Sequence, residues 1–113
     1  MEVINFKEKA DAITKLFEYH LLTKVNDHTF TIVKAQGKTL DFHTHPLCDE
    51  AFFVVEGTMK IEFRDRLVQL REGDMLVIPK GAEHRPVCEE FVTCLVIAIE
   101  GSTKDAPKFR KPT

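Results

Sequence analysis

The sequence lacks any long hydrophobic run, and this absence excludes the usual membrane-spanning helices. Its longest apolar stretches are Ala51–Val55 and Leu95–Ile99, whereas a membrane-spanning helix needs about 20 mainly apolar residues. Residues 1–8 also lack the apolar core of a secretory signal peptide. We therefore expect a cytoplasmic protein that has no membrane partner.

Cysteine is scarce, and its pattern excludes two further classes of protein. The three cysteines, Cys48, Cys88 and Cys94, are odd in number and include no Cys-x-x-Cys pair. A disulfide framework or a zinc knuckle would need paired cysteines at short spacings. We expect Cys88 and Cys94 to be small buried hydrophobic residues. Cys48 lies between a histidine pair and Glu50, where a thiol could bind a soft metal, although a plain loop cysteine is the simpler interpretation.

Strong net charge and nucleotide-binding motifs are absent as well. The net charge is −2, and no basic patch is evident, so nucleic acid is not an expected partner. There is no P-loop and no glycine-rich dinucleotide fingerprint. No serine or cysteine nucleophile stands beside a base in a recognisable motif. These absences argue against a nucleic-acid-binding protein, a nucleotide-binding enzyme and an enzyme with a serine or cysteine nucleophile.

What the sequence does have is the composition of one ordinary globular domain. Of its 113 residues, 43% are hydrophobic and 30% are charged, which is enough to build a buried core. No internal repeat or interdomain linker is visible. We expect a single domain at 1–113, with its core at about 19–100 and a polar tail at 101–113.

Hydrophobic periodicity predicts one short helix followed by many strands. Asn5 and Glu8 have capping-box spacing and begin a helical pattern over residues 5–17, although Val3–Phe6 is also compatible with an edge strand. From Tyr19 onward, short runs of Val, Ile, Thr and Phe alternate with turn residues. The expected strands lie at 19–24, 28–35, 40–45, 50–55, 59–64, 67–71, 75–78, 84–88 and 91–99. This pattern favours an all-β sandwich or barrel.

Four side chains form the strongest candidate site. His43 and His45 are two residues apart, so in a strand their imidazoles would point to the same side. Glu50 follows a proline-containing turn, and His84 follows a second turn at 79–81. Three imidazoles and one carboxylate suit one divalent transition metal, which could be Fe, Mn, Ni, Co, Cu or Zn. Structural zinc prefers thiolate ligands and closed tetrahedral coordination. Because this ligand set has no thiolate, we expect a metal with open coordination positions.

Glu50 has two roles open to it. It could stay bound to the metal and balance the charge, or it could act as a catalytic base toward a bound substrate. Phe52 and Val54 share its strand face and are expected to form an apolar wall, with Met75 or Leu76 opposite. The candidate substrate-pocket residues are Phe52, Val54, Met75 and Arg85.

The predicted strand at 40–45 gives the argument for oligomerisation. Asp41 shares the face of the two histidines, whereas Leu40 and Phe42 lie on the other face. Because exposed apolar strand faces are usually covered, a second sheet or a second subunit should lie against them. We therefore expect a homodimer.

Residues 37–88 resemble the two motifs of the cupin superfamily. The first motif is Gly, five residues, His-x-His, three or four residues, Glu, six residues and Gly; it is matched by Gly37, His43, His45, Glu50 and Gly57. The second is Gly, five residues, Pro-x-Gly, two residues, His, three residues and Asn; it is matched by Gly73, Pro79, Gly81 and His84, with Cys88 in place of Asn. The interval between the motifs, residues 58–72, is as short as in small single-domain (cupin 2 type) members.

This resemblance implies a fold and a metal site. The fold would be a double-stranded β-helix, or jelly-roll barrel, of six to eight strands. The motif residues matching His43, His45, Glu50 and His84 would bind a metal in the mouth of the barrel. Cys88 departs from the family pattern but leaves these four ligands intact.

The fold alone does not choose a reaction, because cupins catalyse many. A dioxygenase-like oxidoreductase acting on a small enol, phenol or similar chelating molecule is our first hypothesis, because the ligand set resembles that of cupin dioxygenases. A sugar-phosphate isomerase or epimerase comes second, because only Arg85 is available to meet a phosphate. A non-catalytic metal-binding or small-molecule-binding module is the third.

Overall fold

The computed structural model describes residues 1–102 as one short helix and eight strands. The elements are α1 (Phe6–Asp11), β1 (His20–Val25), β2 (His28–Ala35), β3 (Lys38–Thr39), β4 (Glu50–Phe63), β5 (Leu67–Arg71), β6 (Met75–Ile78), β7 (His84–Cys88) and β8 (Val92–Ile99). From residue 103 onward, the polar tail predicted from the sequence lies outside the described residues. No helix among residues 1–102 is long and apolar enough to cross a membrane.

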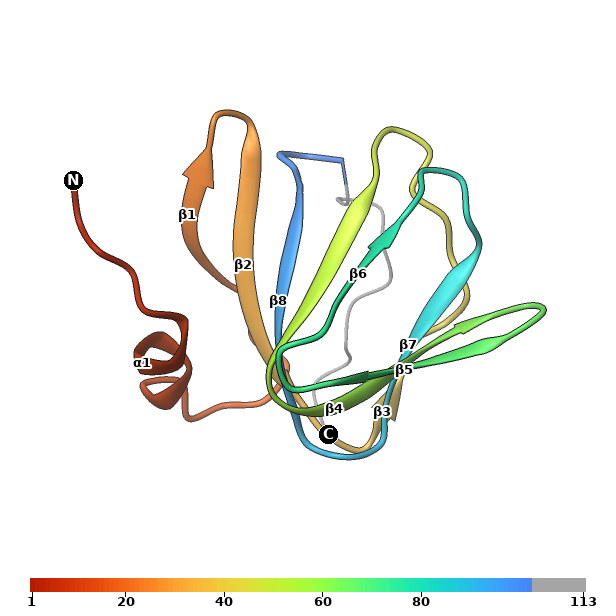
Figure 1. Cartoon of the computed structure of the whole chain (residues 1–113), viewed down its shortest axis with the longest axis horizontal. Coiled ribbons are helices and arrows are strands. Elements are labelled where there is room, and N and C mark those ends of the chain that lie inside the picture. The colour runs from red at the N-terminus through yellow and green to blue at the C-terminus, as the bar shows by residue number, and fades with distance from the viewer. Residues whose placement is uncertain (103–113) are drawn as a thin grey trace.

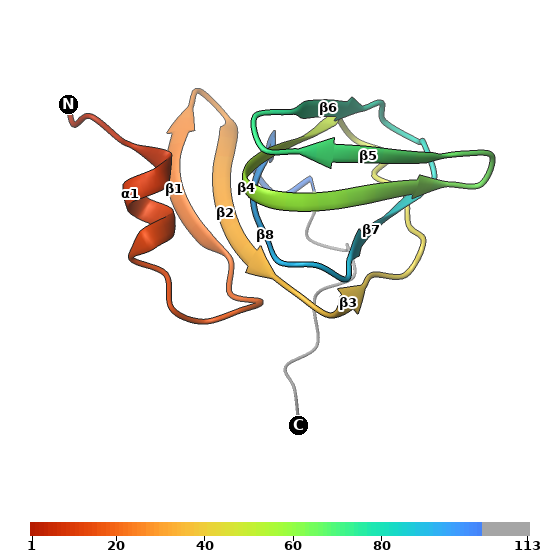
Figure 2. The same cartoon turned by 60° about the horizontal axis from the view of Figure 1, so that its bottom comes forward.

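The sheet is organised around β4, which has antiparallel partners along its whole length. Hydrogen-bonded neighbours follow the order β1-β2-β8-β4-β7-β3, and β5 and β6 also pair with β4. The first part of β4 pairs with β6 and β8, whereas its second part pairs with β5 and β7. The sheet therefore curls into a jelly-roll barrel, with α1 outside it beside β1 (Figure 1 and Figure 2). This confirms the predicted fold class.

The prediction of two separate strands at 50–55 and 59–64 was wrong, because β4 runs through both. Its pairing with β8 shifts register between Val54 and Glu56, which marks a β-bulge. Gly57 follows with a φ of 78°, a value that glycine adopts at little cost. The bulge and this glycine bend β4 without ending it, so one strand belongs to both halves of the barrel.

The helix is shorter than the pattern over residues 5–17 predicted. Asn5 caps it as expected, because its side-chain oxygen accepts a hydrogen bond from the Glu8 N–H at 3.0 Å. The helix ends at Asp11, and Phe17 has a φ of 66°, which no α-helix accommodates. The backbone N–H of Phe17 donates instead to the Lys34 carbonyl at 2.7 Å. The chain thus leaves the helix and crosses toward β2.

The predicted strand at 40–45 is also wrong, and Pro86 explains why. The β3–β7 ladder pairs Lys38 with Cys88 and continues with the Leu40 N–H donating to the Pro86 carbonyl at 3.0 Å. Proline has no N–H to return the second hydrogen bond. Pairing resumes only at the isolated bridge between His43 and His84, one residue out of register. The first histidine is therefore held by a single bridge rather than by a continuous strand.

Two clusters of buried hydrophobic residues form the core, one on each face of the sheet. Inside, the main cluster includes Val54, Met59 and Ile61. On the outer face, Ala10 and Ile13 of the helical region pack on Ile32 and Leu95. Of the other strands, β2, β5, β6 and β7 have the expected bounds and β1 and β8 differ by one residue at their ends, whereas β3 was not predicted.

Candidate metal centre

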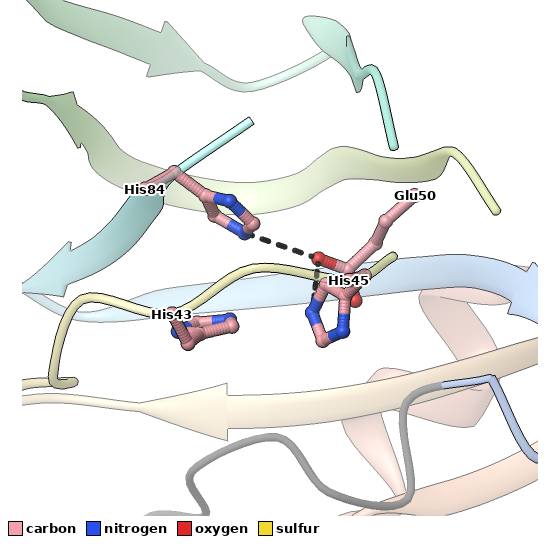
Figure 3. Close-up of side chains that lie close together, drawn as sticks. All are labelled: His43, His45, Glu50 and His84. Carbon is pink, nitrogen blue, oxygen red and sulfur yellow. Dashed lines mark ion pairs between the residues drawn. The ribbon is translucent and has the colours of Figure 1, made fainter. Parts of the chain in front are cut away.

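Four side chains from distant parts of the chain meet at one end of the barrel. His43 and His45 lie on the connection after β3, Glu50 is the first residue of β4, and His84 is the first residue of β7 (Figure 3). One ligand atom from each residue lies within 4.8 Å of every other. His45, Glu50 and His84 are only 4%, 5% and 0% exposed. This group is the set that the sequence predicted.

The polar atoms at the centre of this cluster lack hydrogen bonds. Glu50 Oε1 lies 3.4 Å from both His45 Nε2 and His84 Nε2. All three atoms are buried, and none of them has a hydrogen-bond partner among residues 1–102. A buried polar group without a partner costs about 1–3 kcal/mol, so three around one point need a common explanation. A cation bound between them would supply it, and the donor set fits a divalent transition metal.

The backbone orients two of the imidazoles toward the centre. His43 Nδ1 donates to the Asp41 carbonyl and His84 Nδ1 donates to the Ala82 carbonyl, each at 2.9 Å. Because a carbonyl can only accept, the Nδ1 atoms carry the protons and the Nε2 lone pairs are available as ligands. This support is typical of metal-binding histidines.

Electrostatics keep the half-buried His43 in the form that binds metal. Burial lowers its pKa below the ordinary value for histidine, and the neighbouring His84 and His45 lower it further, whereas the Asp41 carbonyl opposes this shift. A neutral imidazole is the form a metal requires.

A turn holds the two histidine-bearing segments together. The Ala82 N–H donates to the Pro79 carbonyl at 3.1 Å, and Gly81 between them has a φ of 81°, which is typical of a type II turn. The Gly81 N–H then donates to the His45 carbonyl at 2.9 Å. The turn thereby fixes the backbone of His45 beside that of His84.

The structure divides the predicted pocket residues between the two sides of the barrel wall. Phe52 and Val54 are buried on the inner face with Glu50. Met75 pairs with Phe53 and is 56% exposed, so it lies on the outer face. Leu76 pairs with Phe52 and packs on the inner cluster. Of the two alternatives for the opposite wall, Leu76 is the one that faces inward.

Arg85 points away from the metal cluster. Its Nε donates to Glu62 Oε1 at 2.8 Å, and its guanidinium lies 4.5 Å from the centre of the Phe42 ring. The guanidinium of Arg64 lies 3.8 Å from the same ring. These two arginines cover Phe42. Phe42, one of the two apolar residues that predicted a second subunit at this strand, is therefore covered within the chain.

The cysteines take no part in the cluster. Cys48 is buried, and its thiol donates to Ser102 Oγ at 3.0 Å. Cys88 and Cys94 are buried and free, as expected. Burial raises the pKa of Cys88 to about 12 and also raises that of Cys94. Both stay protonated, which makes them poor metal ligands.

A small cavity inside the barrel was not predicted. Its lining includes Tyr19, Phe52, Pro86, Cys88, Cys94 and Val96, and its volume is about 30 Å³. Phe52 was the only one of these residues that the sequence analysis placed in a pocket. Tyr19 precedes β1, and no motif marks it, so only the fold could reveal its position.

The fold and the cluster together define a jelly-roll barrel with three histidines and one glutamate gathered at one end. The profile of the cupin domain matches residues 29–100. The chain therefore belongs to the cupin family.

The chain is similar to one solved structure and to two curated proteins. The crystal structure of a cupin-2 domain containing protein from Shewanella frigidimarina is 38% identical, with a TM-score of 0.81, over 87% of this chain and 95% of that one. The uncharacterized protein YdbB of Bacillus subtilis is 42% identical over 65 residues, 57% of each chain. The 3-hydroxyanthranilate 3,4-dioxygenase of Cupriavidus pinatubonensis is 30% identical over 103 residues, 83% of this chain and 54% of that enzyme. The chain thus spans little more than half the length of the last two relatives.

Proposed function

We propose that this cupin binds one divalent transition metal through His43, His45, Glu50 and His84 and acts as a dioxygenase-like oxidoreductase on a small chelating molecule. The observation that supports the metal most directly is the convergence of three buried polar atoms that have no hydrogen bond among residues 1–102. The similarity to a dioxygenase supports the reaction class.

The protein side chains would divide the work between holding the metal and enclosing the substrate. When bound, the metal would supply Lewis acidity and a template for substrate and O₂. Glu50 would balance its charge, and Phe52 and Val54 would keep water from the inner side of the centre, since both are buried there. Glu50 is also the candidate for a base, since it is the carboxylate of the cluster.

The alternative of a sugar-phosphate isomerase or epimerase is weakened by the position of Arg85. A phosphate site needs cations aimed at the substrate. The guanidinium of Arg85 is already bound to Glu62 and stacked on Phe42, on the face opposite to His84. A non-catalytic binding module remains the outcome to exclude by experiment.

Oxygen consumption tests the reaction. Protein loaded with Fe(II) under anaerobic conditions should consume O₂ in an electrode when a chelating enol, catechol or aminophenol is added, with 3-hydroxyanthranilate included among the candidates. Uptake should need both metal and organic substrate, because the substrate must bind at the centre before it reacts. A His84→Ala variant in the same iron solution serves as the control. Full iron occupancy with no uptake for any substrate would favour the binding module.

We also propose that the chain forms a homodimer, but through β6 rather than through Phe42. Met75 and Val77 of β6 are 56% and 50% exposed and share the outer face with Phe53 and Ala51, their pairing partners. Exposed apolar side chains that are neighbours on one sheet face are typical of contact surfaces.

Val77→Glu should convert a dimer into a monomer, because it would place a charge at the centre of this contact. Light scattering coupled to size exclusion measures the mass directly. Val25→Glu, at an exposed position on β1, is the matched control and should leave the mass unchanged. A wild-type protein that runs as a 13.0 kDa species at high micromolar concentration would disprove the dimer.

A further inference from the structure

The side chains that line the small apolar cavity include some from the layer next to the metal cluster. Along β4 the inward-facing positions after Glu50 are Phe52 and Val54, and along β7 those after His84 are Pro86 and Cys88. Inward positions on one strand are about 7 Å apart, so Phe52 and Pro86 form the next layer of side chains below the cluster. Both line the cavity.

Phe52 connects the two sites. It lines the cavity, and the centre of its ring lies 6.4 Å from that of the His84 ring. Val96 pairs with Phe52 across β4 and β8, and Cys94 pairs with Val54 one layer deeper. Val96 and Cys94 line the cavity as well. Phe52 thus lines the cavity and is also a neighbour of the His84 ring of the cluster.

The chemistry of the lining favours an apolar occupant. It is lined by apolar side chains and by the thiols of Cys88 and Cys94, and Tyr19 is the one lining residue with a hydroxyl group. A buried water needs two to four polar partners, which such a lining does not provide. The thiols of Cys88 and Cys94 remain neutral, because burial raises the pKa of each.

The size of the cavity limits what can enter it. A volume of about 30 Å³ is two to three times what one water requires, roughly 10–15 Å³, and far below the cavity of about 150 Å³ that accepts a benzene ring. A group of one or two carbon atoms fits without rearrangement. A ring does not fit, so any ring would have to remain beside the metal.

We infer that the molecule bound at the metal centre carries a methyl-sized or ethyl-sized apolar group, which fills this cavity, and that Phe52, Cys94 and Val96 select for its length. This inference rests on the proposed function, because the metal must hold the chelating end of the molecule. Tyr19 lines the cavity and is 44% exposed, and its emission should respond to an occupant, since the chain has one Tyr and no Trp.

A series of alkyl hydroxamates on the Co(II)-loaded protein tests the inference. The hydroxamate group binds the metal, and the alkyl chain is lengthened from formo- through aceto- and propiono- to butyro- and valerohydroxamate. Affinity, measured from the Co(II) absorption and from Tyr19 emission, should rise about fourfold per carbon to two carbons, as expected for burying one methylene at a time. It should then fall, because longer chains exceed the cavity.

Variants of the lining make the test specific. Cys94→Ala enlarges the cavity and should move the preferred chain to three or four carbons, and Val96→Ala provides a second enlargement if the first variant folds poorly. Cys48→Ala is the matched control, because Cys48 is also buried but does not line the cavity; its preference should equal that of wild type.

The possible outcomes separate the inference from the proposal on which it rests. The inference would be overturned if hydroxamate affinity did not depend on chain length. It would also be overturned if Cys94→Ala and Val96→Ala left the preferred chain length unchanged. Neither result would contradict the metal centre. Failure of Co(II) to bind, or of every hydroxamate to perturb bound Co(II), would overturn the metal-centre proposal itself.

Discussion

His45→Ala should reduce the bound metal from one ion per chain to a small fraction. His45 is 4% exposed, and its Nε2 lies 3.4 Å from Glu50 Oε1, so no neighbouring water-exposed group can replace it without the barrel opening. Losing a residue that merely supports a ligand weakens metal binding about 10- to 100-fold. Losing a ligand itself should weaken it by at least about 100-fold. Elemental analysis of protein purified without a histidine tag measures the occupancy.

Two further variants make that result interpretable. Glu50→Gln keeps the shape of the side chain but removes its charge, and it should also lower occupancy, because the carboxylate is the single anion among the four ligands. His28→Ala is the control, since His28 is an exposed histidine at the start of β2 beside Asp27. Metal content that remains unchanged in His45→Ala would contradict the ligand assignment.

The site could be predicted from the sequence because its signal is local. The spacing from His43 to Glu50, and that from Pro79 to His84, each lie within a single turn and its flanking residues. The same holds for β5 and β6, whose apolar runs end at charged or proline-containing turns. Where a pattern depends only on the residues in one short segment, sequence reasoning recovers it.

The errors arose where residues far apart in the chain decide the outcome. The strand predicted at 40–45 stops because of Pro86 in its partner strand. Phe42 does not need a second subunit, because Arg64 and Arg85 cover its ring. Neither fact is visible in the segment itself. The cavity was missed for the same reason, since Tyr19 and Cys94 become neighbours only when the barrel closes.

Gly57 lies inside β4 and connects the two halves of the barrel, although its sequence context predicts the end of a strand. Glu56-Gly57 has the composition of a turn, which predicted the end of a strand there. In the structure, Gly57 pairs with Val92 of β8 while its φ of 78° bends β4. Because Glu50 lies at the start of this strand, the bend also sets where the metal cluster lies relative to β7.

Gly57→Ala should destabilise the protein more than any other glycine substitution among the described residues. A Cβ at this position would lie 2.1 Å from the carbonyl oxygen of Phe91 and 3.1 Å from Val92 Cα. Both are backbone atoms of the segment that enters β8, so relief requires moving the strand pair rather than rotating a side chain. Together with the cost of a positive φ, roughly 1–3 kcal/mol, we expect a loss above about 4 kcal/mol, which only a few mechanisms produce.

Gly73→Ala separates the two contributions to that loss. Gly73 has a similar φ of 87°, but an added Cβ would meet no atom within 4 Å. Its substitution should therefore lower the free energy of unfolding only by the same conformational strain, about 1–3 kcal/mol. Urea denaturation of both variants, without added metal, measures the difference. Equal losses of unfolding free energy in the two variants would mean that the approach of Phe91 to Gly57 does not constrain the barrel. A difference of several kcal/mol between the variants would show that the bend in β4 depends on the absence of a side chain at residue 57.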